Sequence, residues 1–434
     1  MSKAVFQRIL SGTALCAVLG AVVTAPFGAW AQTNERGGMW SKLRLTERFL
    51  TRDTTSPDAA TDGITNQAVT ALDFTFFTET RTEKLSFDFG GEYRLTDGPT
   101  TDGLEGDFMS PNLRLRYDQV AADASIMAMI TASQVDLADV SPLSVTDSSG
   151  EALATDVSGL TDGGTRTQLG FNSRLTIRDD APFGLAFGFL VNDISYADLP
   201  AGSTLDESTT ARADVTGRFD ISPVLQARLG AHYSYTQTDG APQTDRYGIT
   251  AGATLTRPNG AYSLAASHAD GDGGGISNLS VGRSFVLPQT ETNVALGVAR
   301  ATDDTLFMTG SASFEHDFGQ GSALGPLTLS ADRSVTLTGR SNEEVISSLS
   351  LASSYALSPV ANLRLTAELG QAEEVATGDT VTLSEVGLSL GYAFSRDWRG
   401  GADIRAKRRD PSDSAATEST TFGISLSRSF ETRY

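Results

Sequence analysis

The sequence predicts an all-β protein that forms a single antiparallel sheet of about 20 strands, with bounds of about 18 and 22. Two observations support this prediction. Apolar residues recur at every second position in stretch after stretch, which is the period of a strand with one apolar and one polar face. The connections between these stretches alternate between short and long along the chain. The repeated unit is therefore a hairpin, and the chain forms one domain.

The C-terminal segment, residues 420–434, shows the strand pattern most clearly. Every second residue counted back from Tyr434 is mainly apolar as far as Phe422, and Phe430 lies on this face. The alternate positions are polar or small: Arg433, Glu431, Ser429, Ser427, Ser425, Gly423 and Thr421. This segment is predicted to be an amphipathic strand that ends on an aromatic residue.

Similar alternation predicts the other strands. Their expected ranges are 41–50, 67–80, 83–95, 111–119, 124–132, 167–177, 185–191, 212–221, 225–235, 247–255, 262–266, 279–285, 294–298, 306–314, 327–337, 345–357, 363–369, 381–394 and 398–406. The phase changes once within a strand, from Val381 and Leu383 to Val386 and Leu388, which predicts a β-bulge there.

The connections between the strands distinguish membrane from soluble architectures. Short turns are expected at 79–83, 120–123, 179–182, 220–223, 257–260, 287–290 and 395–397, and long loops at 51–66, 96–108, 137–164, 197–205, 269–275 and 408–417. Short periplasmic turns that alternate with longer extracellular loops are typical of a transmembrane β-barrel. A soluble sandwich has no reason to alternate loop length so regularly.

The amphipathic strands, the loop alternation and the terminal aromatic together resemble bacterial outer-membrane β-barrel proteins, and porins among them. The resemblance covers nearly the whole mature chain as a pattern. No porin signature is present, and the Pro-Glu-Phe-Gly-Gly-like run of the third loop of general porins is missing. The resemblance implies a cell outer-membrane location, surrounding lipid and lipopolysaccharide, and recognition of Phe430 and Tyr434 by the barrel-assembly machinery.

The N-terminus has the features of a secretory signal peptide at residues 1–31. Lys3 and Arg8 precede an apolar core, and Ala29-Trp30-Ala31 is a small-residue cleavage signal. The expected organisation is then a short periplasmic segment at 32–40 and a barrel at 41–434. Residues 32–40 are too few to form a plug domain before the barrel. Cys16 is the only cysteine, so the mature chain is expected to contain none.

Composition and motifs exclude several functions. The net charge of −20 argues against nucleic acid as a partner, because phosphate contacts need a basic face. No H-E-x-x-H, G-x-S-x-G or Walker glycine loop occurs, and the three histidines lie on different expected strands. The run Asp270–Gly275 resembles a calcium loop, but it lacks the carboxylate that an EF-hand needs at its twelfth position, and it occurs once, whereas repeat-type calcium sites need several copies. We therefore expect no enzyme activity, no cofactor and no metal site.

Charged residues in the polar phase of the strands are candidates for the pore lining: Asp73, Asp88, Glu92, Arg114, Arg116, Arg174, Arg178, Arg212 and Arg218. The longest loop carries candidates for a constriction: Asp139, Asp147, Glu151, Asp156 and Asp162. In porins such a loop folds inward and its acids face a basic wall. The alternative is an exposed acidic loop, with arginines that pair with Asp88, Glu92 and Asp118 on neighbouring strands.

The function expected from these features is a porin-like passive channel for small polar solutes. One alternative is a non-transport surface barrel that serves adhesion or envelope integrity. Another is an export channel for a surface polymer. The oligomeric state is not predicted by the sequence.

Overall fold

The computed structural model describes residues 38–56, 62–99, 105–137, 164–199, 205–272, 274–302, 304–319, 322–337, 343–412 and 415–433. Their strands form one sheet of twenty members. In chain order these are β1 (Gly38–Thr55), β2 (Gly63–Glu79), β3 (Glu83–Asp97), β4 (Glu105–Val120), β5 (Ala124–Asp136), β6 (Thr165–Ile177), β7 (Phe183–Ala197), β8 (Ser208–Ser222), β9 (Leu225–Thr238), β10 (Thr244–Arg257), β11 (Gly260–Gly271), β12 (Ile276–Leu287), β13 (Thr290–Arg300), β14 (Leu306–His316), β15 (Leu324–Leu337), β16 (Glu343–Ser358), β17 (Ala361–Glu374), β18 (Thr380–Ala393), β19 (Trp398–Pro411) and β20 (Thr417–Arg433). In this described part, no helix is long and apolar enough to cross a membrane.

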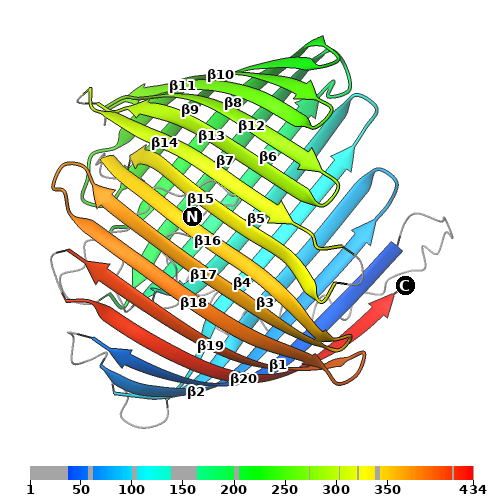
Figure 1. Cartoon of the computed structure of the whole chain (residues 1–434), viewed down its shortest axis with the longest axis vertical. Coiled ribbons are helices and arrows are strands. Elements are labelled where there is room, and N and C mark those ends of the chain that lie inside the picture. Colours follow the sequence, from blue (N-terminus) through cyan, green and yellow to red (C-terminus); the bar gives the residue numbers. More distant parts are fainter. Residues whose placement is uncertain are drawn as a thin grey trace.

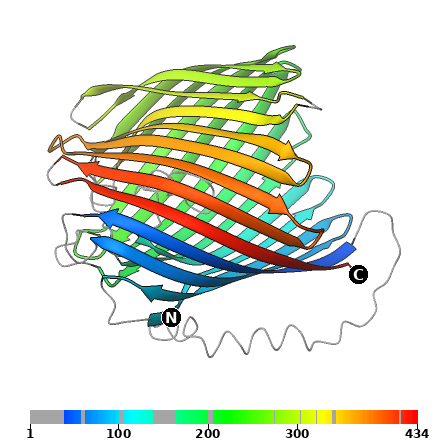
Figure 2. The same cartoon turned by 60° about the horizontal axis from the view of Figure 1, so that its bottom comes forward.

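The sheet closes into a barrel of tilted strands (Figures 1 and 2). Each strand pairs antiparallel with its neighbours in sequence, and β1 also pairs with β20. The closing register runs from Trp40 opposite Arg433 to Thr55 opposite Glu418. Both edges of the sheet are thereby paired, which a lipid environment requires because it offers no hydrogen-bonding groups.

The two faces of the wall differ in polarity. On β20, Phe422, Ile424, Leu426 and Phe430 are between 43 and 51% exposed, although all four are large and apolar. On the other face of β20, Thr421, Ser425 and Ser429 lie opposite the β1 residues Arg52, Arg48 and Arg44. Exposed apolar side chains recur in the same phase on the other strands. An apolar band outside and a polar wall inside are the features of a barrel that spans a membrane.

The structure confirms the predicted all-β class, and each expected strand range overlaps one observed strand. Observed strands are usually longer, and β1 extends to Thr55 although its apolar alternation ends at Phe49. Backbone pairing continues past the apolar band, where side chains need not be apolar. The predicted short turns are confirmed as well; links such as 223–224, 258–259, 288–289 and 359–360 contain two residues each.

The predicted bulge in β18 is wrong. Pairing of β18 with β17 and with β19 is continuous, without a register shift. Val381 and Leu383 face inward and are 5% exposed, whereas Val386 is 52% exposed on the outer face. The apolar residues change face near the loop end of the strand, and the backbone does not slip. Register shifts occur instead near Gly90, Asp220, Leu324 and Ala356.

The closing seam can be tested by a cross-link between Thr46→Cys on β1 and Ser427→Cys on β20, which lie directly opposite each other. Opposed residues of antiparallel strands have Cα atoms about 4.5–5.5 Å apart, within the range of about 4.4–6.8 Å that disulfides span. Oxidation should therefore give a cross-linked, faster-migrating band on a denaturing gel. The control pair Thr46→Cys with Ser313→Cys on β14 should not cross-link. Equal cross-linking of both pairs would contradict the β1–β20 seam.

Candidate functional site

The inner wall carries a group of cationic side chains on strands β4 to β9. Arg114 and Arg116 of β4, Arg174 of β6, Arg212 of β8 and His232 of β9 line a common hollow of about 710 Å³. We call these five residues the basic cluster. They share a hollow because the register brings the inward positions of successive strands side by side, with Arg174 opposite Gly188 and Asp214 opposite both Gly188 and His232.

Glycines keep this hollow open. Gly188 and Gly230 lie in its wall between the charged residues. A Cβ atom at Gly188 would collide with the carboxylate of Asp214, and one at Gly230 would collide with the hydroxyl of Thr250. The missing side chains leave room for water and solute next to the arginines.

The cluster is only partly neutralised by carboxylates. The Arg116 guanidinium donates to Asp118 through Nε at 2.7 Å and through Nη2 at 2.8 Å, which is a bidentate pair. Arg114 and Arg174 have no ion pair or side-chain hydrogen bond within the described ranges. Arg212 and His232 do have further interactions. Of the residues that the structure describes, Asp214 is the one carboxylate that lines the hollow itself. The described lining therefore carries a net positive charge, although the chain as a whole is strongly acidic.

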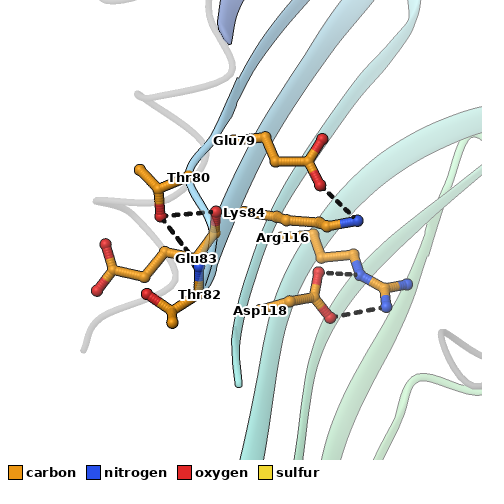
Figure 3. Close-up of polar contacts among 7 residues, drawn as sticks. All are labelled: Glu79, Thr80, Thr82, Glu83, Lys84, Arg116 and Asp118. Carbon is orange, nitrogen blue, oxygen red and sulfur yellow. Dashed lines mark hydrogen bonds and ion pairs between the residues drawn. The ribbon is translucent and has the colours of Figure 1, made fainter. Parts of the chain in front are cut away.

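The turn end of this wall is fixed by polar contacts (Figure 3). Lys84 Nζ lies 2.8 Å from Glu79 Oε1. The Thr80 hydroxyl accepts the N–H groups of Thr82 at 3.4 Å and Glu83 at 3.0 Å. Such a side-chain bond holds a short turn in one geometry. It fixes the β2–β3 hairpin, whose second strand pairs with β4, the strand that carries Arg114 and Arg116.

A second charged region lies on β16 to β20 and β1, and here opposite charges are matched. Its hollow of about 530 Å³ is lined by acids and bases together: Arg48, Arg364, Glu368, Glu385, Asp403 and Arg405. Arg48 Nη2 lies 3.3 Å from Asp403 Oδ1, and Arg405 Nε lies 3.2 Å from Glu385 Oε1. We call this region the mixed wall. The two regions give the inner surface an uneven charge distribution.

The structure places most of the predicted pore-lining residues on the inner face. Arg218 points inward and its charge is matched by Asp220 at 3.5 Å and Asp179 at 3.7 Å. Arg178 lies in the β6–β7 turn with a φ of 57° and is exposed at the rim. The remaining inward residues are Asp73, Asp88, Glu92, Arg114, Arg116, Arg174 and Arg212. Asp139, Asp147, Glu151, Asp156, Asp162 and Tyr434 lie outside the described residues.

The alternative, arginines paired with Asp88, Glu92 and Asp118 on neighbouring strands, holds only in part. Asp118 pairs with Arg116 and Glu92 pairs with Arg94 at 3.1 Å, but each pair lies along one strand, and Arg94 is not among the predicted residues. The mixed wall, His232 of the basic cluster and Asp214 of the same hollow are also absent from the predicted pore-lining set. The one feature of the sequence that points to these residues is that they stand at the polar, inward-facing positions of their strands.

No catalytic constellation is found among the residues that the structure describes. Ser267 and His268 point to opposite faces of β11, and His268 Nδ1 lies 2.8 Å from the Ser277 hydroxyl on the outer side. No group of three or more His, Cys, Asp or Glu side chains in this part of the chain could hold a metal ion.

Comparison with solved structures shows the same architecture. The ferric enterobactin receptor of Pseudomonas aeruginosa (PfeA, Q482A mutant, in complex with enterobactin) aligns with a TM-score of 0.50 and 9% identity, over 92% of this chain and 82% of that one. The fold is that of an outer-membrane β-barrel. A BenF-like porin from Pseudomonas fluorescens Pf-5 (TM-score 0.42, 14% identity, 90% and 99% covered) and Acinetobacter baumannii OccAB4 (0.40, 11%, 92% and 100%) are also similar. No protein-family model and no curated protein matches the chain.

The partial neutralisation of the cluster can be tested with Asp118→Asn. Loss of this carboxylate frees the Arg116 guanidinium, so any ion that passes the cluster should meet one more uncompensated positive charge. We expect the reversal potential in a salt gradient across a planar bilayer to shift toward anion selectivity. The matched control is Asp332→Asn, which removes one carboxylate from the inner face of β15, away from the cluster. An equal shift for both variants would mean that total charge matters and the local cluster does not.

Proposed function

We propose that the protein is a passive channel of the cell outer membrane through which small polar solutes diffuse, with a preference for anions. The observation that supports this most directly is the pair of hollows on the polar inner wall, one of them lined by the basic cluster. A barrel of this strand number is too wide for its own side chains to fill. The proposed activity involves no covalent step.

The basic cluster supports the anion preference because its positive charges attract a passing anion and repel a passing cation by energies large enough to matter. Two unit charges 4 Å apart interact by about 1 kcal/mol in bulk water and by about 4 kcal/mol at an effective dielectric constant of about 20. A difference of about 1.4 kcal/mol between an anion and a cation at this site changes the ratio of their occupancies tenfold. Arg114 and Arg174, which have no carboxylate partner among described residues, would therefore change relative permeability severalfold without trapping the solute.

The acidic loop that contains Asp147, Glu151 and Asp156 is proposed to oppose this cluster across the lumen. The loop joins β5 and β6, and both strands contribute residues to the hollow: Met127, Met129, Asn172 and Arg174. A loop attached there is well placed to set up a transverse field with the arginines.

Joint replacement of Asp147, Glu151 and Asp156 by their amides is then expected to raise anion selectivity, because the negative side of the field disappears. The measurement is the single-channel reversal potential. Asp410→Asn with Glu418→Gln is the control, since these carboxylates pair with Arg408 on the outer phase of β19 and β20. Selectivity equal to that of the unaltered chain would show that the loop does not face the pore.

The assembly signal is proposed to be the outward aromatic face of β20, with Phe430 and Tyr434, read by the barrel-assembly machinery. Phe430 is exposed on the outer face. It lies opposite Leu43 of β1, in the pairing of the first strand with the last strand that closes the barrel. A signal at this strand would couple recognition to closure.

Swelling of proteoliposomes tests the channel proposal. Vesicles that contain the protein should swell in isotonic glucose, faster in gluconate and slower in glucosamine. Arg114→Gln with Arg174→Gln should reduce the gluconate-to-glucosamine ratio by threefold or more. Arg364→Gln with Arg399→Gln, on the inner face of β17 and β19, should change it less. A folded barrel that admits none of the three solutes would refute the channel and favour an adhesion or envelope role.

A further inference from the structure

Two arginines on the outer face of the barrel have nearly identical surroundings. Arg283 of β12 and Arg428 of β20 each begin the tripeptide Arg-Ser-Phe, at 283–285 and at 428–430. Both point outward, in the same phase as Val281 and Leu426. Each lies directly opposite an aromatic residue on the preceding strand, Tyr262 for Arg283 and Trp398 for Arg428.

Each guanidinium lies between two aromatic rings. The Arg283 guanidinium carbon is 3.9 Å from the centroid of Tyr262 and 4.7 Å from that of Phe285. For Arg428 the distances are 4.6 Å to Phe430 and 5.2 Å to Trp398. Such cation–π contacts contribute about 0.5–1 kcal/mol each at exposed sites. We call the two arrangements the Arg283 clamp and the Arg428 clamp.

The positive charge of both clamps lacks a protein counter-ion in the described part of the chain. Neither arginine forms an ion pair there, and Nη1 of Arg283 is buried without a hydrogen-bond partner. An arginine on the lipid face costs about 2–4 kcal/mol at the bilayer midplane but only about 0–1 kcal/mol near the interface. Both clamps lie near the short-turn end, since Tyr262 is two residues from the start of β11 and Trp398 begins β19. At this depth the abundant anion is the phosphate of a phospholipid headgroup.

An apolar groove adjoins the Arg283 clamp. It has a volume of about 530 Å³ and lies on the outside of β8 to β12, with Ala227, Ala251, Ala253 and Ala266 as small residues and Phe219, Leu229, Leu264 and Leu279 as large ones. Leu264 follows Tyr262 by two residues on one face, and Leu279 precedes Arg283 by four. At about 3.3 Å per residue, the groove therefore extends from about 7 Å to about 13 Å from the clamp toward the bilayer centre.

We propose that this surface binds one glycerophospholipid of the periplasmic leaflet. The Arg283 guanidinium binds the phosphate, and the rings of Tyr262 and Phe285 hold the guanidinium plane in position. One acyl chain lies in the groove, whose small residues are alanines. Arginine suits this role because its planar fork donates two parallel hydrogen bonds to a phosphate. The Arg428 clamp, on β20, offers the same headgroup contact at a second position on the outer face. The site lies outside the lumen and is independent of the proposed channel activity.

Native mass spectrometry of the detergent-purified barrel tests the site, with dimyristoylphosphatidylglycerol as the probe. The unaltered chain should retain the lipid, and Arg283→Gln should lower the retained fraction at least fivefold. The matched control is Arg333→Gln, an outward arginine of β15 that donates to the Ser347 hydroxyl at 2.7 Å and should leave retention unchanged. Heat-modifiable gel mobility verifies that each variant is folded.

Three further measurements test the groove, the phosphate contact and the need for acyl chains separately. Ala266→Phe should fill the groove and reduce retention while Arg283 stays intact. Dimyristoylglycerol, which has the chains without the phosphate, should be retained at least fivefold less by the unaltered chain. Equal retention of the two lipids, or equal retention by the Arg283→Gln and Arg333→Gln variants, would overturn the headgroup assignment. Displacement of the lipid by millimolar inorganic phosphate alone would show an anion site without a lipid site.

Discussion

The pairing of β1 with β20 is the interaction on which the rest of the structure depends. In a bilayer each unpaired backbone N–H or C=O costs several kcal/mol, so an open sheet edge is not tolerated. The two terminal strands of the sheet remove both edges by pairing along nearly their full length. Closure also fixes which face of each strand is inside. A shift of one residue at this seam would turn either the arginines of β1 toward lipid or Phe422, Ile424 and Leu426 of β20 toward the lumen.

Because the barrel is closed, alternate side chains along each strand face two different environments, lipid outside and the lumen inside. The outer set of side chains needs only to be apolar, whereas the inner set is free to carry charge. Charges then interact with residues two positions along the same strand, as Arg116 with Asp118, or diagonally across to the next strand, as Arg405 with Glu385. The basic cluster remains unbalanced because small or neutral residues, Gly188, Gly230 and Asn172, occupy the positions beside its arginines. The uneven field inside the barrel is therefore a local property of sequence in β4 to β9.

The strands were predictable because alternation over ten or more residues is a strong local signal, and the closing strand showed it from Phe422 to Phe430. The face of each charged residue followed from the same alternation. The grouping of Arg114, Arg174 and Arg212 did not, since the register across β4 to β8 depends on the connections between these strands. The error at Val381 has a related cause. Near the loop end an apolar side chain can pack inside the barrel, so polarity there no longer reports orientation.

The central claim is that a closed wall surrounds an open, water-filled path. The most direct test is the unitary conductance of the purified protein in a planar bilayer, recorded over a hundredfold range of potassium chloride. An aqueous path predicts discrete steps whose size rises with bath conductivity, together with a reversal potential on the anion side at low salt, where fixed charges are least screened. A folded, heat-modifiable barrel that inserts without producing steps would contradict the account.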